Sequence, residues 1–338
     1  MIKVQADLDS TDKVLLNTLQ TEFPLSLKPF HWLARRLGVT EEEIIGRTRR
    51  LKEADILRQI SAIFDSRALG YSSVLVAMKI DPSRLDSGAE TVNRHSGVSH
   101  NYARDHEFNL WFTLTTPPGV SIEDEAQRLG SEAGAKAVRL LPTVRLFKIG
   151  VAFDMTDSDD ARVAPSNQVA ATRSPSAEKL TRDEIKAVRA LQEDLPLETR
   201  PFKRLAERFE MTEDQILDMA RSFIGRGIMR RYAGTLRHRA AGFRANAMGV
   251  WVVPEDRVEE VGQVMAGFAA VSHCYQRPTY PDWPYSLFTM IHGRSRAECE
   301  AVAREISDAA GIAEYRLLFS AKEYKKIRVR YFDEVGVE

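Results

Sequence analysis

The stretch VSHNYAR at residues 98–104 returns as VSHCYQR at residues 271–277, so both read V-S-H-x-Y-x-R. Successive side chains of an extended strand point to opposite faces, so the His, Tyr and Arg of each stretch are predicted to share one face. They are His100, Tyr102, Arg104, His273, Tyr275 and Arg277. An imidazole, a phenol and a guanidinium on one surface can transfer protons and hold an anion. The two stretches therefore predict a functional scaffold that is present twice.

The repeat extends far beyond these stretches. At a constant offset, matching segments are residues 23–25 and 195–197, 29–30 and 201–202, 33–34 and 205–206, and 56–58 and 228–230. Between the two halves, residues 154–179 are rich in Asp, Ser, Ala, Thr and Pro and have no apolar period, which is typical of a solvated linker. The length of 338 residues is consistent with two or more domains.

Each half begins with three short helical patterns. In the first half, apolar spacing predicts helices over residues 12–20 and 30–37. A capping-box pattern at Thr40 opens a third helix that runs through Lys52, and a β-rich segment follows at residues 55–60. Three helices with a short turn before the third, followed by a wing, predict a winged helix-turn-helix.

The remainder of each half alternates strands and helices. In the first half, strands are predicted near 73–80, 98–104, 109–115 and 138–147, with helices near 81–95 and 122–133. In the second half, strands are predicted near 247–253, 270–277, 285–292 and 314–324, with helices near 256–267 and 296–309. The order β-α-β-β-α-β is the ferredoxin-like arrangement.

The predicted fold class is therefore α+β, a tandem repeat of a winged helix-turn-helix and a ferredoxin-like domain. The expected divisions are 1–62 and 180–235 for the helix-turn-helix units, 63–153 and 236–338 for the ferredoxin-like units, and 154–179 for the linker.

Composition excludes several classes of protein. Lys plus Arg equals Asp plus Glu at 48 each, so no global field attracts the chain to nucleic acid or to a membrane. No stretch of about 18 apolar residues is present and the N-terminus lacks the apolar core of a signal peptide. Cys274 and Cys299 show no metal-binding spacing, which is consistent with a reducing compartment. We expect a cytoplasmic protein that does not insert into a membrane.

The third helix of each head is the segment that would read DNA. In the first half it carries the basic residues Arg47, Arg49, Arg50 and Lys52, which could contact phosphates. Its counterpart begins with acidic residues, Glu213 and Asp214, which would repel the DNA backbone. With zero net charge, we expect no specific DNA binding.

A helix-turn-helix head joined to a β-α-β-β-α-β body resembles the Lrp/AsnC regulators. The V-S-H-x-Y-x-R strand followed by Asn109-Leu110-Trp111-Phe112-Thr113-Leu114, together with the wing and the duplication, is similar to the siroheme decarboxylases, in particular the fused NirD–NirL type of haem d1 biosynthesis. The resemblance implies that two acetate carboxyls, at C12 and C18, are removed from siroheme to give 12,18-didecarboxysiroheme. It also implies no cofactor beyond the iron tetrapyrrole substrate, and a homodimer. Separate subunits of this family also serve the alternative haem pathway.

A flat macrocycle with several carboxylates requires guanidinium or ammonium groups and apolar walls. The expected substrate-binding residues are Arg58, Arg230, Arg231, Arg145, Lys148, Lys322, Lys325, Trp111 and Trp283. Solvated edge strands, which often carry Lys, are an alternative explanation for the cations of the last strands. Burial in a core is the alternative explanation for many of the aromatic residues.

The chemistry implied by the resemblance requires a proton for each methyl group that replaces an acetate. His100 or His273 is expected to donate it, with Tyr102 or Tyr275 orienting the donor and Arg104 or Arg277 holding the carboxylate. Either His could instead be a ligand of the substrate iron, and the sequence does not choose between these roles. An Lrp/AsnC-type transcriptional regulator and a haem-binding chaperone are the alternative functions.

The two halves differ directly after the repeated strand. The first half turns through residues 105–107, whereas the second has the longer, proline-rich and aromatic segment 278–284. Proline lowers the entropy that a loop loses on ordering, so this segment is expected to be stiff. The difference predicts that the two pockets are not equivalent.

Overall fold

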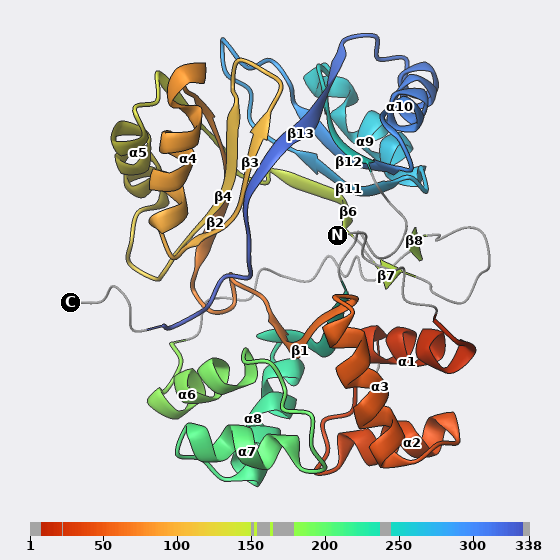
Figure 1. Cartoon of the computed structure of the whole chain (residues 1–338). Helices are drawn as coiled ribbons and strands as arrows, with labels where there is room; N and C mark the ends of the chain where they lie inside the picture. The colour runs from red at the N-terminus through yellow and green to blue at the C-terminus, as the bar shows by residue number, and fades with distance from the viewer. Residues whose placement is uncertain are drawn as a thin grey trace.

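The computed structural model describes residues 8–21, 23–149, 152–153, 163–164, 179–236 and 245–333 (Figure 1). Most of the predicted linker at 154–179 lies outside the described residues. A short strand pair, β7 (Ala152–Phe153) with β8 (Val163–Ala164), is described within this region. No described helix is long and apolar enough to cross a membrane.

The helix-turn-helix units lie together at one end of the molecule, below the sheets in Figure 1. The first contains α1 (Ser10–Thr21), α2 (Pro29–Leu37), α3 (Glu41–Glu53) and wing strand β1 (Leu57–Phe64). The second contains α6 (Arg182–Leu191), α7 (Pro201–Arg208), α8 (Glu213–Gly225) and wing strand β9 (Met229–Leu236). Thr40 caps α3, because its hydroxyl accepts the Glu43 backbone N–H at 3.2 Å. This is one half of the predicted capping box, and the Glu43 carboxylate instead pairs with Arg47 at 2.8 Å.

The two units are joined by their wings and by a shared core. Strands β1 and β9 pair antiparallel, with Ser61 opposite Ala233. Large buried side chains from both units, such as Phe30 and Phe202, belong to one hydrophobic cluster. The two heads therefore pack as a single body.

The ferredoxin-like units confirm the predicted fold class. The first contains β2 (Ser72–Lys79), the 3-10 turn η1 (Pro82–Arg84), α4 (Leu85–Arg94), β3 (Val98–Arg104), β4 (Leu110–Thr116), α5 (Ile122–Ala133), β5 (Ala137–Leu141) and β6 (Arg145–Ile149). The second contains β10 (Ala245–Trp251), the 3-10 turn η3 (Glu255–Arg257), α9 (Val258–Gly267), β11 (Val271–Gln276), β12 (Leu287–Gly293), α10 (Arg296–Ala310) and β13 (Tyr315–Lys326).

The halves exchange their last strands. The nine-stranded sheet has the order β5-β2-β4-β3-β13-β10-β12-β11-β6. Strand β13 pairs with β10 of its own half and then with β3 of the first half. Strand β6 of the first half pairs with β11 of the second. Each V-S-H-x-Y-x-R strand is therefore bordered by a strand from the other half.

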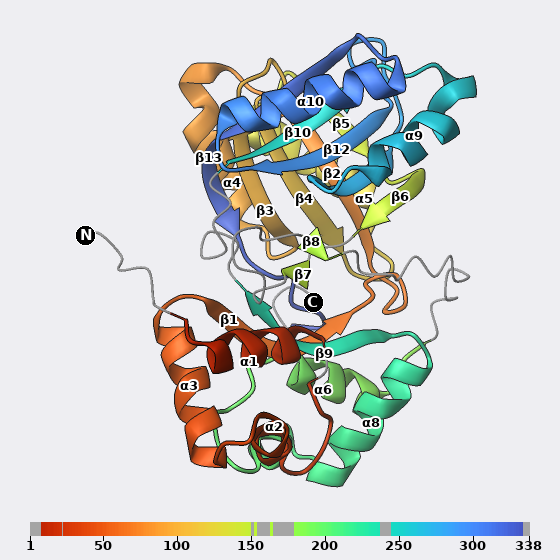
Figure 2. The same cartoon turned by 90° about the vertical axis from the view of Figure 1, so that its right-hand side faces the viewer.

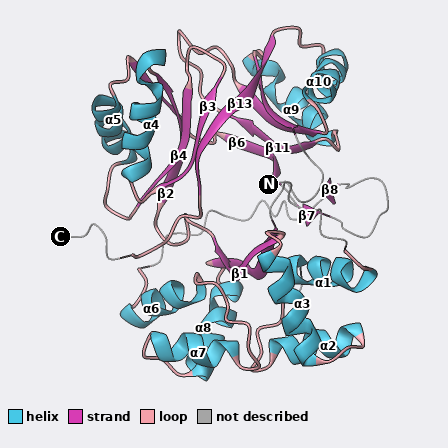
Figure 3. Ribbon diagram, in the orientation of Figure 1, coloured by secondary structure: helices cyan, strands magenta, loops and turns pink. Residues whose placement is uncertain are grey.

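The two half-sheets face each other, with helices on their outer faces. Helices α4 and α5 cover one outer face, and α9 and α10 cover the other (Figures 2 and 3). The inner faces share a cluster that joins Trp111 and Leu141 of the first half to Trp283, Phe288 and Leu318 of the second. Hydrophobic burial between the sheets therefore holds the halves together in addition to the exchanged strands.

The last strand of the first half differs from the prediction. The structure divides the predicted strand over 138–147 into β5 and β6. Strand β5 ends at Leu141, before Pro142, which has no N–H to offer a sheet. Val144 then donates its N–H to the Gln276 carbonyl at 2.9 Å, so the chain continues at the edge of the other half's sheet.

Candidate active site

His100, Tyr102 and Arg104 share one face of β3, as strand alternation predicts. The His100 and Tyr102 ring centroids are 6.3 Å apart, and the Arg104 guanidinium carbon lies 5.8 Å from the Tyr102 ring centroid. Between them, Asn101 points to the helix side, where it donates to the Ala89 carbonyl at 3.2 Å. The three candidate side chains, His100, Tyr102 and Arg104, therefore lie on the face away from α4.

The second half repeats this arrangement on β11. The His273 and Tyr275 ring centroids are 5.9 Å apart, and the Arg277 guanidinium carbon lies 5.0 Å from the Tyr275 ring centroid. Cys274 points the other way and is fully buried in the core beneath α9. We call these two sets the first-half and second-half clusters.

His100 is held in its neutral form. Burial, together with the positive charges of Lys326 and Arg58 and against the negative charge of Glu323, lowers its pKa to about 4. Its Nδ1 lies 2.9 Å from the Ser99 hydroxyl. Because cations depress this pKa, an anionic ligand that neutralises them would raise it and prepare the imidazole to carry a proton.

Both cluster arginines reach across to the other half. Arg104 donates to the Leu318 carbonyl at 2.6 Å, and Arg277 donates to the Leu141 carbonyl. Burial lowers the pKa of each guanidinium to about 10. Among the described residues, neither guanidinium pairs with a carboxylate, and the Nε of each has no hydrogen-bond acceptor. Arg104 is a buried cation and Arg277 a half-buried one, and the lack of a counter-charge among the described residues favours the arrival of an anion.

The predicted wing arginines lie beside the clusters. Arg58 donates to the Lys326 carbonyl at 3.5 Å, next to His100 in the β3–β13 pairing. Arg230 pairs with Asp65 at 2.8 Å. Burial raises the pKa of Tyr275, and the charge of Arg230 acts against this increase. Burial, followed by repulsion from Arg230, lowers the pKa of Arg231. The wings therefore bring positive charge to both clusters.

Arg328 belongs with these residues, although the sequence analysis did not select it. It follows β13 and lies across the paired wings, donating to the Ser61 hydroxyl at 2.7 Å and to the Thr235 hydroxyl. Burial, with repulsion from Arg58, lowers its pKa to about 10. The available signal was the basic run that continues past the last predicted strand, at Lys325, Lys326 and Arg328.

The predicted cations of the exchanged strands have partners on the helix side. Lys322 pairs with Asp86 at 2.8 Å, and Lys325 donates to the Asn93 carbonyl at 2.7 Å, both at α4. Arg145 and Lys148 lie on the other exchanged strand, β6. Arg145 pairs with Glu259 and Lys148 donates to the Phe268 carbonyl, both at α9. The structure thus places these four residues against helices and does not bring them together with the clusters.

Trp111 and Trp283 are fully buried between the sheets. Their ring centroids are 5.2 Å apart, and Trp111 donates its indole N–H to the Phe108 carbonyl at 2.6 Å. They bridge the halves within the inter-sheet cluster, and this conformation leaves no ring face open to a ligand.

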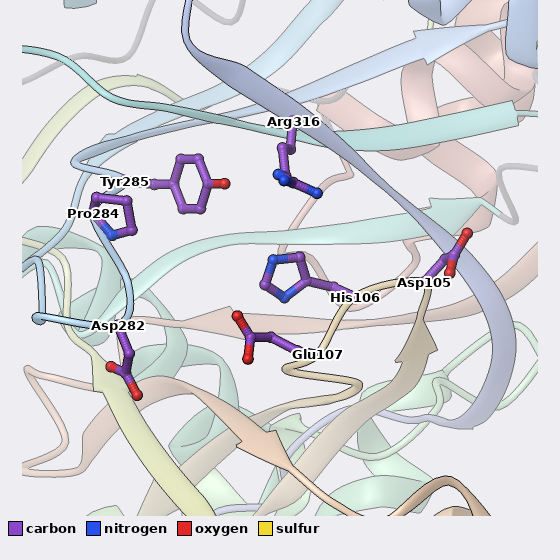
Figure 4. A pocket seen from close by; sticks show the side chains of 7 residues that line it. All are labelled: Asp105, His106, Glu107, Asp282, Pro284, Tyr285 and Arg316. Atoms are coloured by element: carbon purple, nitrogen blue, oxygen red, sulfur yellow. The ribbon is translucent and has the colours of Figure 1, made fainter.

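A separate cavity of about 450 Å³ lies where the turn after β3 meets the loop before β12 (Figure 4). It is lined by Asp105, His106, Glu107, Asp282, Pro284, Tyr285 and Arg316. Glu107 and Asp282 are paired with Lys79 and Arg139. Within the described residues, no group of three or more His, Cys, Asp or Glu side chains could hold a metal ion.

Three of the four basic residues singled out on α3, namely Arg47, Arg50 and Lys52, are engaged within the protein. Arg47 contacts Asp9, Asp12 and Glu43 at 2.6, 2.9 and 2.8 Å. Arg50 also pairs with Asp12 at 2.9 Å. These ion pairs withdraw positive charge from the helix that would contact DNA phosphates.

Two family models match the chain, each in both halves. The AsnC-like ligand binding domain matches residues 68–148 and 240–325. The siroheme decarboxylase NirDL-like helix-turn-helix domain matches residues 12–58 and 184–230.

Relatives of known identity match nearly the whole length. A siroheme decarboxylase of Hydrogenobacter thermophilus is 42% identical over 324 residues, covering 96% of this chain and 95% of the relative. The crystal structure of the siroheme decarboxylase NirDL has a TM-score of 0.77 at 38% identity, covering 96% of this chain and 95% of that one. A second NirDL crystal structure, in complex with an iron-uroporphyrin III analogue, has a TM-score of 0.76 at 37% identity over the same shares. With the duplicated fold and the matched clusters, these similarities show that the chain belongs to the siroheme decarboxylase family.

Proposed function

We propose that this chain is a carboxy-lyase that removes the C12 and C18 acetate carboxyls of siroheme, giving 12,18-didecarboxysiroheme for haem d1 biosynthesis. Family membership supports the activity. The observation that carries the assignment of the site is the pair of matched His-Tyr-Arg clusters beside the arginines of the paired wings.

Substrate carboxylates are the natural counter-charge for this region. The wings provide four cations, and the clusters add buried Arg104 and half-buried Arg277. The wing cations are Arg58, Arg230, Arg231 and Arg328. Guanidinium groups bind carboxylates through paired, charge-assisted hydrogen bonds. Carboxylates that bind here would also reduce the repulsion among the arginines. Hydrogen bonding and charge therefore both favour a ligand that carries carboxylates.

Each decarboxylation breaks one C–C bond, releases CO₂ and leaves an electron pair that must take up one proton. Of the groups in each cluster, the His is the best donor, because its pKa can be brought near neutrality. Burial is the main cause of the low pKa of His100, which is about 4. Carboxylates bound beside the ring would raise this pKa, both by their own negative charge and by offsetting Lys326 and Arg58. Tyr102 and Tyr275 flank the rings and orient them.

One of the two histidines could serve instead as a ligand of the substrate iron. The repeat supplies two equivalent imidazoles, so one can bind iron while the other transfers the proton. A shift of the Soret band of bound siroheme in a His variant would identify an iron ligand.

We also propose a cytoplasmic homodimer without specific DNA binding. Val144 is 60% exposed directly before the edge strand β6, and Leu146 is 40% exposed on that strand, which favours contact with a second copy. Light scattering during size-exclusion chromatography tests the assembly.

Anaerobic incubation with siroheme, followed by mass spectrometry of the extracted tetrapyrrole, tests the activity. Loss of two carboxyl groups is the expected result. A bound but unchanged tetrapyrrole would contradict decarboxylation and support a haem chaperone. Sequence-specific operator binding without turnover would support a regulator.

A further inference from the structure

A serine connects two histidines in the second half. The Ser272 hydroxyl oxygen lies 2.7 Å from Nδ1 of His273 and 2.7 Å from Nε2 of His292. Ser272 is completely buried, at a register shift of β11 that places it between the paired residues Val271 and His273. The hydroxyl oxygen also lies 3.4 Å from the Met290 carbonyl, which is a longer contact than either of those to the imidazoles. A hydroxyl has one proton, so in the shorter pair of contacts it donates to one imidazole and accepts from the other. The three side chains form a continuous hydrogen-bonded path between two titratable rings.

The first half has only the beginning of this path. The Ser99 hydroxyl lies 2.9 Å from Nδ1 of His100, as in the second half. Strand pairing aligns His100 with Thr113 and His273 with Met290, so Thr115 occupies the position of His292. The Thr115 hydroxyl donates to the Ser73 hydroxyl at 3.1 Å, within the first half's own sheet. The Ser-His pair is duplicated, whereas the second imidazole is not.

His292 lies on the same side of its sheet as the cluster. Along β12, Leu287 and Ile291 pack on the helix side, while Phe288 and Met290 pack between the sheets. Strand alternation therefore places His292 with Phe288 and Met290, on the face that carries His273 and Tyr275.

We propose that His292 supplies protons to His273 through Ser272, so that the second-half cluster has an internal proton source. This proposal rests on the proposed decarboxylase function. One proton leaves Nε2 of protonated His292 for the Ser272 oxygen as the Ser272 proton passes to Nδ1 of His273. His273 then gives the proton on Nε2 to the substrate carbon that has lost CO₂. His273 is then neutral with its proton on Nδ1. Solvent returns one proton to Nε2 of His273 while the Nδ1 proton passes back through Ser272 to His292, so each released CO₂ consumes one proton.

The path has a clear use in this reaction. The carbon that has lost CO₂ must take up its proton while the macrocycle still covers the site. A lone neutral imidazole would become an anion on giving up its proton, whereas His273 gains a proton at Nδ1 as it gives up the one at Nε2 and stays neutral. In these roles Ser272 and His292 are positioning and relay residues, because they act through His273.

His292→Gln is the decisive variant. The Gln amide can keep a hydrogen bond to Ser272 but cannot carry a proton at neutral pH. Under anaerobic conditions at saturating siroheme, we expect the rate to fall by at least about tenfold, with siroheme affinity unchanged. Thr115→Val is the matched control in the first half and should leave the rate unchanged. A His292→Gln rate equal to that of the wild type would overturn the relay, as would a loss confined to affinity.

Chemical rescue separates proton supply from structure. Added imidazole should restore turnover to His292→Ala but leave His292→Gln slow, because Gln fills the space. Imidazole also binds haem iron, so its effect on the wild type is the reference. Absence of rescue in a folded His292→Ala would contradict the relay.

A ligand-free measurement keeps this test apart from the proposed function. In the relay, Ser272→Ala should shift the ring ¹⁵N resonances of both His273 and His292, while Thr115→Val should shift neither. Failure of the wild type to decarboxylate siroheme would contradict the proposed function but not the hydrogen-bonded coupling of His273 and His292. Unchanged resonances in Ser272→Ala would contradict the relay even if the wild type is active.

Discussion

At the residue scale, the two cluster histidines differ from ordinary strand residues in having a Ser partner at Nδ1, at 2.9 Å for His100 and 2.7 Å for His273. Such a bond fixes the ring orientation and leaves Nε2 as the nitrogen directed to chemistry. We expect His100→Ala or His273→Ala to keep the folded circular-dichroism spectrum. At least one should lower turnover by about a hundredfold or more. Near wild-type rates in both variants and in the double variant would exclude the acid role.

His100 also makes a prediction about stability and pH. Its folded pKa of about 4 lies below the ordinary value of 6.5, chiefly because of burial. Between these values the unfolded chain binds a proton that the folded protein does not, so stability falls as pH decreases from 6.5 toward 4. His100→Gln should lack this pH-dependent decrease in stability. Its melting temperature should therefore fall less than that of the wild type between pH 7 and pH 4.5. Equal decreases in the two proteins would show that the pKa of His100 is not lowered in the folded state.

The buried arginines should contribute to binding rather than to stability. Arg104 is 8% exposed and has no counter-charge among the described residues. Replacing such a cation by an apolar residue of similar length is often neutral or stabilising. Arg104→Met is therefore expected to keep the melting temperature and weaken siroheme binding by roughly ten- to a hundredfold, the value of a charge-assisted hydrogen bond. A lower melting temperature with intact affinity would identify the bond to Leu318 as the main role.

At the scale of elements, helix α3 has the position of a recognition helix without its charge. Arg47 and Arg50 are paired with acidic residues of the same head, and α8 begins with Glu213 and Asp214. We expect weak, non-specific binding to duplex DNA that disappears as salt increases. Fluorescence anisotropy with labelled duplexes measures it. Nanomolar affinity for one defined sequence at physiological salt would contradict this expectation.

The elements also show how far sequence reasoning extends. Apolar periods and the repeat predicted the helices, the strands and the shared face of each cluster, because these depend on local geometry. They did not predict that β6 and β13 cross to the other half. Strand alternation identifies which residues share a face, but not what that face meets. Trp111 therefore appeared as a ring-binding residue, although it packs against Trp283 between the sheets.

At the scale of the whole molecule, the halves should not survive apart. Strand β6 completes the sheet of the second half, β13 completes that of the first, and the wings pair across the halves. An isolated half would expose the inter-sheet cluster and unpaired strand edges. Residues 1–165 and 166–338 expressed as two chains should therefore purify together in equal amounts, and either chain alone should aggregate. A stable, monomeric single half would contradict this view of the assembly.

The duplication within one polypeptide also permits broken symmetry. A dimer of identical chains must carry every substitution in both copies, so its two sites change together. In this chain His292 stands on one side of the pseudo-twofold axis and Thr115 on the other, although the strands around them match. Because the two copies lie at different positions of one polypeptide, each can be substituted independently, and their ratio is always one to one. A substrate that loses two carboxyl groups from different corners is suited to an enzyme whose twin sites are free to specialise.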